Sequence, residues 1–319
     1  MSYLEVEPKF LRDPKNLKLK EIAVFSKDLS LKNLNHSLEN YKRVLGYEPV
    51  GVNIFLGIGW DGSTAGRPGA RFSPQKIIEK FLSLNLNHSY KKSIFIAPYA
   101  KVIIGDKKKT FKNISKTVEK ILEIKNIKNL KFFIGGDHSI TFPIVDQYLN
   151  FYQELNLVVF DTHFDLRILD EGLSGGTYLQ ELKNKHANRL NVLILGIKDL
   201  ANPEYLYTEA KKYEIKYLTN LEIMQSFEKV EKFLDGNLYK NKPVYISFDI
   251  DSMDIAYVDS VNSPYSFGFR IEEVYRIVSY LKDKYEVVGM DLVEFNPLVG
   301  NFEKSVSYVS QFLYYFSRY

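Results

Sequence analysis

Short apolar runs recur along this chain and alternate with longer stretches in which apolar residues are spaced as on one face of a helix. Most runs are apolar at successive positions, which is typical of strands buried on both faces of a parallel sheet. The runs predict strands at 21–26, 52–58, twice within 93–105, and at 131–139, 157–160, 192–197, 244–252 and 286–294. The helical spacing predicts helices at 31–47, 73–82, 110–124, 142–148, 203–212, 223–234, 271–281 and 306–316.

This alternation of strands and helices predicts the fold class. Repeated β–α units imply a sheet covered on both faces, so we expect a three-layer α/β/α architecture with a doubly wound, mostly parallel sheet. No Pro/Ser-rich linker, charge block or internal repeat divides the chain, so residues 1–319 are expected to form one domain. Residues 1–50 carry the weakest pattern, and we treat them as an N-terminal extension that says little about function.

Composition excludes several classes of function. The chain has 319 residues, of which 45% are hydrophobic and 26% charged, as is ordinary for a soluble globular protein. The net charge of +4 is spread along the chain, and the basic run Lys107-Lys108-Lys109 is expected to be a solvated turn rather than a nucleic-acid patch. No cysteine is present, which excludes thiolate metal ligands and a cysteine nucleophile. Because no apolar segment is long enough to cross a membrane and no apolar leader opens the chain, we expect a cytoplasmic protein without a membrane partner.

Charged side chains gather where four of the predicted strands end. Ligands of a doubly wound sheet bind outside the carboxyl ends of its strands, so the residues just after each run are the candidates for chemistry. They are Asp137 and His138, then Asp161, His163 and Asp165, then Asp249 and Asp251, and finally Asp291 and Glu294. Asp161, His163 and Asp165 occupy alternate positions, so their side chains point the same way if the chain stays extended.

Carboxylates in this number would repel one another unless a positive charge stood among them, and a divalent cation is the natural candidate. Oxygen ligands with some nitrogen and no sulfur favour Mn²⁺ over Zn²⁺, Co²⁺ or Ni²⁺. The ligating groups exceed what one tetrahedral site needs, so we expect two ions that share carboxylates. Such a pair can turn water into a nucleophile at neutral pH.

A simpler interpretation is a set of independent polar loops. Asp249 and Asp251 would then cap turns, and His138 would be a buried imidazole bonded to a backbone carbonyl. His186, in the polar run 185–188, is expected at the surface. The joint arrangement at four strand ends favours the metal site over this alternative.

Five segments together resemble the ureohydrolase (arginase/agmatinase) superfamily of binuclear manganese hydrolases. They are GGDHS at 135–139, DTHFD at 161–165, SFDID at 247–251, GRPGARFSP at 66–74 and MDLVEFNP at 290–297, and the resemblance covers roughly residues 50–317. It implies an arginase-like fold and two Mn²⁺ per subunit. One ion would be held by His138, Asp161, Asp165 and Asp249, and the other by Asp161, His163, Asp249 and Asp251. It also implies that Glu294 holds a planar amidinium group and that Asp165 passes a proton to the leaving amine.

Within the superfamily, the DxHFDLR pattern followed by a Gly-Thr turn most resembles the formimidoylglutamases, which hydrolyse N-formimidoyl-L-glutamate to L-glutamate and formamide. By this resemblance Arg167 would pair with a substrate carboxylate, and Thr177 and Asn262 would line the substrate site. A structural ion pair beside the metal cluster is the alternative role for Arg167. The match is incomplete, because arginases and agmatinases carry His-Gly, and formimidoylglutamases Ser-Gly-Thr-Pro, where this chain has Gly175-Gly176-Thr177-Tyr178.

Three hypotheses therefore stay open. The favoured one is a Mn²⁺-dependent hydrolase of a linear amidine, with N-formimidoyl-L-glutamate as its substrate. The second is an agmatinase or another guanidino-compound hydrolase that releases urea. The third is a metal-binding homologue without catalysis, which the missing histidine at position 175 would explain. The resemblance also implies a homo-oligomer, either a trimer or a hexamer, and a small-molecule substrate rather than a nucleic acid.

Overall fold

One parallel sheet of nine strands organises the computed structural model, which describes residues 16–124, 129–168 and 172–318. Its order is β1-β3-β2-β4-β9-β8-β5-β6-β7, and every neighbouring pair runs parallel. The strands are β1 (Ala23–Phe25), β2 (Val52–Gly57), β3 (Ser93–Ile96), β4 (Asn129–Ile134), β5 (Leu155–Phe160), β6 (Leu190–Ile197), β7 (Lys216–Thr219), β8 (Val244–Asp249) and β9 (Val287–Val293). The predicted fold class is confirmed.

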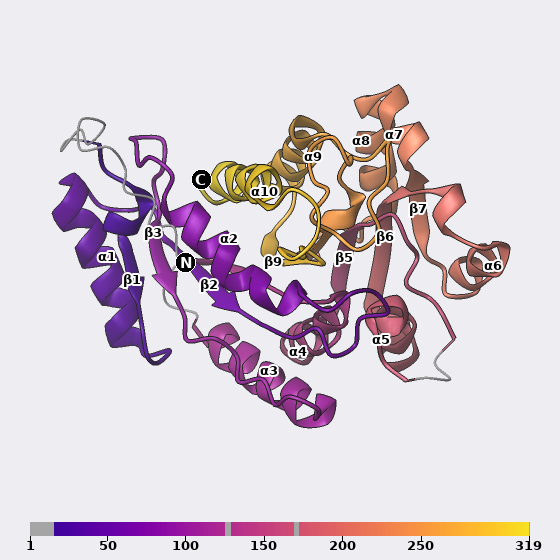
Figure 1. Ribbon diagram of the computed structural model, residues 1–319, viewed down its shortest axis with the longest axis horizontal. Helices are drawn as coiled ribbons and strands as arrows, with labels where there is room; N and C mark the ends of the chain where they lie inside the picture. Colours follow the sequence, from indigo (N-terminus) through magenta and orange to yellow (C-terminus); the bar gives the residue numbers. More distant parts are fainter. Residues whose placement is uncertain (1–15, 125–128, 169–171, 319) are drawn as a thin grey trace.

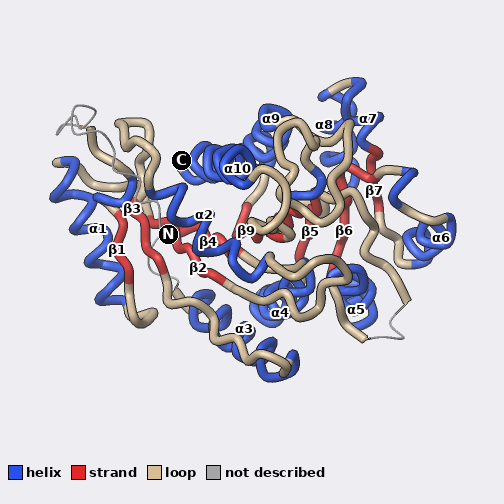
Figure 2. Tube along the Cα trace, viewed as in Figure 1, coloured by secondary structure: helices blue, strands red, loops and turns tan. Residues whose placement is uncertain are grey.

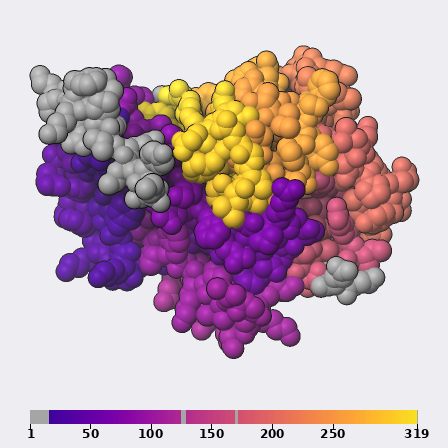
Figure 3. Space-filling view, in the orientation of Figure 1, coloured from indigo at the N-terminus to yellow at the C-terminus, as the bar shows by residue number. Residues whose placement is uncertain are grey.

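Helices cover both faces of this sheet (Figures 1 and 2). One face carries α2 (Ser73–Leu82), α7 (Asn220–Gln225), α8 (Phe227–Asn237), α9 (Ile271–Lys284) and α10 (Phe302–Ser317). The other face carries α3 (Lys107–Leu122), α4 (Thr141–Phe151), α5 (Tyr178–His186) and α6 (Glu204–Lys212). Figure 3 shows α10, in yellow, beside violet residues of the first third of the chain, where α10 packs on α2. In the described ranges no helix has both the length and the apolar character to cross a bilayer.

Burial on both faces explains why the strands read as continuous apolar runs. In β5, Leu155, Leu157 and Val159 point into the core beneath α3 to α6. Val158 and Phe160 point into the opposite core, which α2 and α8 to α10 cover. Each apolar side chain buried in this way contributes about 1.5–3 kcal/mol to the free energy of unfolding. Apolar residues are therefore favoured on both faces of the strand, and the sequence shows no alternation of apolar and polar positions.

The described part of the N-terminal extension belongs to the same sheet. β1 pairs with β3 at the sheet edge, and α1 (Leu31–Leu45) packs beside both strands. The helix begins where the Ser30 hydroxyl accepts the backbone N–H of Asn33 and ends at Gly46, whose positive φ of 81° suits glycine. Residues 1–15 of the extension lie outside the described residues.

Some predicted elements differ from the structure. Residues 101–105 form no strand but a turn before α3, and Lys107-Lys108-Lys109 is the first turn of that helix rather than a solvated turn. The helix begins there because Asp106 accepts the backbone N–H of Lys109. The single helix predicted at 223–234 is broken at Ser226 into α7 and α8.

Two further predictions failed at the edge of the sheet and on α5. β7 was not predicted, because this edge strand buries only Leu218 and so lacks an apolar run. His186 is not at the surface: it is buried at the end of α5, where its Nε2 lies 2.7 Å from Oδ1 of Asp146. The polar run around it hid a side chain that points inward from the last turn.

Lys131 offers a test of this fold through its protonation. It lies in β4 with 9% of its surface exposed, and burial lowers the pKa of its ammonium to about 8, although Glu286 partly opposes the shift. Below pH 8 the buried ammonium lowers the free energy of unfolding by its full amount. This penalty disappears as pH rises through 8 towards the ordinary pKa of 10.5. We expect Lys131→Met to raise the free energy of unfolding by about 1–3 kcal/mol at pH 7 and by progressively less up to pH 10.5.

Urea unfolding at several pH values measures this difference. Lys216→Met in the exposed edge strand β7 is the matched control and should change stability little at any pH. A Lys131→Met gain that stays constant from pH 7 to pH 10.5 would contradict the role of the buried ammonium.

Candidate metal centre

The candidate site lies where β4, β9, β8 and β5 end, and these four strands are consecutive in the sheet. Parallel strands end at the same edge, so the residues that follow them meet there. His138 opens a short 3-10 turn after β4, and Asp161 directly follows β5. Asp249 is the last residue of β8, and Glu294 follows β9. The order of the strands thus brings together residues more than 150 positions apart.

Three carboxylates surround one nitrogen of His138. Its Nδ1 lies 3.3 Å from Oδ2 of Asp161, 3.1 Å from Oδ2 of Asp165 and 3.1 Å from Oδ2 of Asp249. His138, Asp161 and Asp249 are buried, and Asp165 is nearly so. This first cluster contains all four residues that the family resemblance assigns to one ion.

A second cluster shares Asp161 with the first. Nδ1 of His163 lies 3.2 Å from Oδ2 of Asp251 and 3.5 Å from Oδ1 of Asp161. Asp161 therefore presents one oxygen to each imidazole, as a bridging ligand must. Asp249 contacts His138 and lies close enough to Asp251 for the two charges to interact, but its own bridging role stays a prediction.

Unpaired polar atoms inside the clusters fit a cation. Nδ1 of His138, Oδ2 of Asp161 and Oδ1 of Asp251 are buried without a hydrogen-bond partner among the described residues. Buried polar atoms are rarely left unpaired unless a water molecule or an ion completes them. Ligand atoms of His138, Asp161 and Asp165, and those of Asp161, His163 and Asp251, also lie within 4.8 Å of one another. The described residues thus fit two adjacent divalent ions.

The carboxylates differ in pKa because they are buried next to one another. Burial, and then the charge of Asp161, raises the pKa of Asp165 to about 6. Burial, and then the charges of Asp251 and Asp161, raises the pKa of Asp249 well above its ordinary value. Burial opposes ionisation of Asp161 too, but the two neighbouring imidazoles lower its pKa to about 2. These groups ionise together only where positive charge compensates them, and a divalent cation supplies such charge.

The backbone at residues 161–165 is not extended, so the alternation considered for Asp161, His163 and Asp165 does not apply. β5 ends at Phe160, and Asp165 adopts a left-handed conformation with φ of 51°. Glu294 is also left-handed, with φ of 64°. Such conformations cost about 1–3 kcal/mol outside glycine and cluster at functional sites. Local backbone geometry, rather than strand alternation, turns Asp165 towards His138.

Asp291 was predicted to lie at the sheet edge with the other carboxylates, and this prediction is wrong. Asp291 lies behind the centre and supports it. It lies inside β9, fully buried, opposite Ser247 of β8. Its carboxylate accepts hydrogen bonds from Ser247 Oγ at 2.7 Å and from the hydroxyls of Thr141 and Tyr245, both at 3.0 Å.

This arrangement determines how His138 presents its ring. The Ser247 proton is donated to Asp291, so Ser247 Oγ, 3.0 Å from Nε2 of His138, accepts the Nε2 proton. In the neutral ring, Nδ1 then carries a lone pair towards the three carboxylates, which is favourable only when a cation lies between them. The Tyr178 ring packs 4.3 Å from the imidazole, centroid to centroid.

A cavity of about 590 Å³ opens from the two clusters to the surface. Asp165, Glu294 and both imidazoles line its buried end. Oε1 of Glu294 accepts the backbone N–H of His138 at 2.7 Å, which holds this carboxylate beside the first cluster. Burial, and then the charge of Asp137, raises the pKa of Glu294 to about 8.

Arg167 lies on the exposed wall of the same cavity. Its side chain forms no ion pair within the described part of the chain, so the structural ion pair considered for it is not observed. The aliphatic part of Arg167 packs over Gly176, where an added Cβ would lie 3.1 Å from Cδ. Glycine at position 176 therefore leaves the arginine room along the cavity wall.

Thr177 and Asn262 also line the cavity, but each already holds a loop. The Thr177 hydroxyl accepts the backbone N–H of Ser174 at 2.7 Å and stabilises the turn at 175–177. The Asn262 amide pairs with both the N–H and the C=O of Arg67. A direct contact of Thr177 or Asn262 with a substrate stays a prediction.

Position 175 lies against the carboxylate of Glu294. A Cβ added to Gly175 would be 3.4 Å from Oε1 of Glu294 and 3.7 Å from Cβ of His138. A side chain at this position would enter the site, so the glycine leaves space that a histidine would fill.

Four residues that contact His138 or Asp291 were not predicted from the sequence. Ser247 lies two positions before Asp249 in β8, so both side chains point to the same face of the strand. A polar residue at this position in an apolar run could have been recognised from the sequence as a neighbour of the site. Thr141, Tyr245 and Tyr178 carry no such signal, because each is part of a helix or strand that reads as ordinary core.

This chain is similar to several known proteins in sequence. Residues 53–317 match the sequence profile described as the Arginase family. The chain is 28% identical to an arginase of Plasmodium berghei, over 92% of this chain and 88% of that protein. It is 30% identical to an N(1)-aminopropylagmatine ureohydrolase of Thermococcus kodakarensis, over 76% and 81%. It is 24% identical to a formimidoylglutamase of Macrococcus caseolyticus, over 73% and 72%.

Solved structures show the same fold. A formimidoylglutamase from Bacillus subtilis superposes with a TM-score of 0.79 at 18% identity, covering 98% of this chain and 94% of that one. A formiminoglutamase from Trypanosoma cruzi, crystallised with Mn²⁺, superposes with a TM-score of 0.73 at 19% identity, covering 83% and 92%. At these identities the likeness establishes the architecture alone.

Removing Asp249 should remove metal. We expect the wild-type chain to take up two Mn²⁺ and to gain thermal stability from them, because ligands that bind only the folded state stabilise it. Asp249→Ala should lose at least one ion and most of this gain, because its carboxylate lies beside residues of both clusters.

Elemental analysis after gel filtration and melting curves with and without Mn²⁺ measure both effects. Asp199→Ala removes an exposed carboxylate that is hydrogen-bonded to Tyr207 and should leave the metal content unchanged. Full Mn²⁺ content in Asp249→Ala would contradict its role as a ligand.

Proposed function

This chain belongs to the arginase family, and we propose that it hydrolyses a C–N bond of a linear amidine that has an acidic tail. The favoured substrate is N-formimidoyl-L-glutamate, which would give L-glutamate and formamide. One observation carries the proposal: carboxylates and imidazoles lie at the buried end of the cavity, whereas Arg167, with no ion-pair partner in the described ranges, lies at its exposed end. A substrate that is cationic at one end and anionic at the other fits this division.

The residues that would hold two Mn²⁺ are those of the two clusters. His138, Asp161, Asp165 and Asp249 would bind one ion, and Asp161, His163, Asp249 and Asp251 the other. When bound, the ions supply positive charge that lowers the pKa of a water molecule and makes it a nucleophile at neutral pH. The Asp291–Ser247 pair keeps the His138 ring oriented for this role.

Asp165 and Glu294 would act on the reacting group. Glu294 faces the planar amidinium and accepts its N–H groups, which orients the central carbon. Asp165 accepts a proton from water and passes it to the amine nitrogen as the C–N bond breaks. Both carboxylates line the buried end of the cavity, where water is restricted and such interactions strengthen.

A guanidino-acid hydrolase that releases urea is the second candidate. It would use the same clusters and the same Glu294, and the relatives include agmatinases and a ureohydrolase. Arg167 at the exposed end disfavours agmatine itself, whose far end is an amine, but does not disfavour guanidinobutyrate, which ends in a carboxylate. A cytoplasmic location and a homo-oligomeric state also remain predictions.

A panel of four substrates separates these functions. Mn²⁺-loaded protein is incubated with N-formimidoyl-L-glutamate, arginine, agmatine and guanidinobutyrate, and formamide and urea are measured. We expect formamide from the first compound and little urea from the others, because only the first combines an amidine with a dianionic tail. Urea from agmatine without formamide from the first compound would overturn the substrate, and Asp165→Asn with unchanged turnover would overturn the mechanism.

Arg167→Ala tests the acidic tail. We expect KM for N-formimidoyl-L-glutamate to rise about ten- to a hundredfold, since a charged hydrogen bond is lost, while kcat changes less. Arg167→Lys should recover part of the loss, because the charge returns without the planar fork. An unchanged KM in Arg167→Ala would show that the arginine has a structural role.

A further inference from the structure

Lys107 places a second positive charge on the wall of the site cavity. It is the first residue of α3 and lines the cavity together with Arg167 and the cluster residues. Its Nζ donates to the carbonyl of Leu173 at 2.6 Å. In the described ranges no carboxylate forms an ion pair with it. Its charge is therefore uncompensated by acidic side chains of the described chain.

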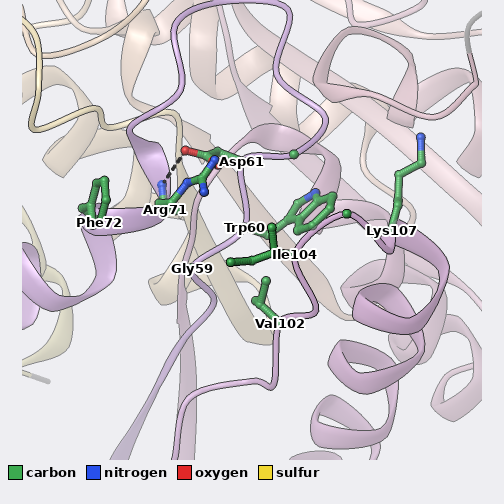
Figure 4. A pocket seen from close by; sticks show the side chains of 10 residues that line it. Gly59, Trp60, Asp61, Arg71, Phe72, Val102, Ile104 and Lys107 are labelled. Atoms are coloured by element: carbon green, nitrogen blue, oxygen red, sulfur yellow. Dashed lines mark hydrogen bonds and ion pairs between the residues drawn. The ribbon is translucent and has the colours of Figure 1, made fainter.

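The other two lysines of the run do not share this position. Lys109 pairs with Asp106 at 3.0 Å, and Lys108 is exposed on the helix. Lys107 also borders a neighbouring cavity of about 420 Å³ lined by Trp60, Val102 and Ile104, among other residues. Its side chain extends away from these three residues (Figure 4), so the ammonium does not serve the neighbouring cavity. Its polar contact lies instead on the loop beside the metal centre.

One loop contacts both Lys107 and Arg167. The Leu173 carbonyl accepts the Lys107 ammonium, and the Gly176 carbonyl accepts the backbone N–H of Arg167 at 2.9 Å. Gly172, at the start of the same segment, would place a Cβ 3.8 Å from Nζ of Lys107. Small residues thus leave both side chains room beside the cavity, while the Leu173 carbonyl holds the Lys107 ammonium and the Gly176 carbonyl holds the backbone of Arg167.

We propose that Lys107 determines specificity by receiving the second carboxylate of a dianionic substrate, the first being paired with Arg167. This inference rests on the proposed function and narrows its substrate class to amidines of dicarboxylic amino acids. Arginine presents a planar fork suited to one carboxylate, and the lysine ammonium is a point charge that can keep its bond to Leu173 while it accepts another partner. A monoanionic guanidino acid would leave one of the two cations unpaired.

The test compares Lys107→Met with Lys108→Met, which removes the same charge from the same helical turn outside the cavity. Substrates are N-formimidoyl-L-glutamate and two analogues that each lack one carboxylate, N-formimidoyl-γ-aminobutyrate and N-formimidoyl-L-norvaline. Lys107→Met should lower kcat/KM about ten- to a hundredfold for the dianion, through KM. For the analogue that lacks the carboxylate bound by Lys107, kcat/KM should stay unchanged. Lys108→Met should change kcat/KM for none of the three substrates.

An equal loss of kcat/KM on all three substrates in Lys107→Met would show that Lys107 only tethers the loop. No loss of kcat/KM would show that Lys107 does not contact the substrate. Either result overturns the inference. Calorimetric binding of L-glutamate to the Mn²⁺-loaded protein separates this inference from the proposed function. Absence of turnover by the wild type defeats the function alone. Weaker binding of L-glutamate to Lys107→Met than to Lys108→Met still supports the lysine, and equal binding overturns it.

Discussion

Repulsion among buried carboxylates is the constraint on which the rest of this structure depends. Three of them lie within 3.3 Å of one imidazole nitrogen, and Asp161 also serves the second cluster. Uncompensated charges at such depth would cost several kcal/mol each, so the arrangement is stable only around positive charge. Four consecutive strands of the sheet provide the ligands, and the left-handed backbone at Asp165 adds a further local cost that the fold must offset.

The sequence predicted the class of fold and the residues that gather at the strand ends, because both leave local signals. Strands buried on two faces appear as apolar runs, and the candidate ligands follow those runs directly. Features that depend on tertiary packing left no such signal. Edge strand β7 buries only Leu218, His186 turns inward from a polar run, and Asp291 looks like an edge carboxylate although β9 continues past it to Val293. The turn of the backbone at Asp165 is likewise invisible in strand alternation.

The buried end and the exposed end of the cavity differ in the residues that line them. The buried clusters and Glu294 lie in the part of the chain that matches the Arginase family, and the similar proteins include an arginase and a formimidoylglutamase. The exposed end carries the distinctions: Gly175 leaves space beside Glu294, Gly176 gives room to Arg167, and the 172–176 loop holds Lys107. Under the proposed function, specificity would depend on the loop residues that contact Lys107 and Arg167, whereas the chemistry would depend on the residues at the strand ends.

We infer that two metal ions bind this site and share Asp161. Crystals of the Mn²⁺-loaded protein, measured on both sides of the manganese absorption edge, test it most directly. We expect two anomalous peaks, one against Nδ1 of His138 and one against Nδ1 of His163, with Asp161 in contact with both. A single peak, or two peaks of which either lies away from these imidazoles, would contradict it.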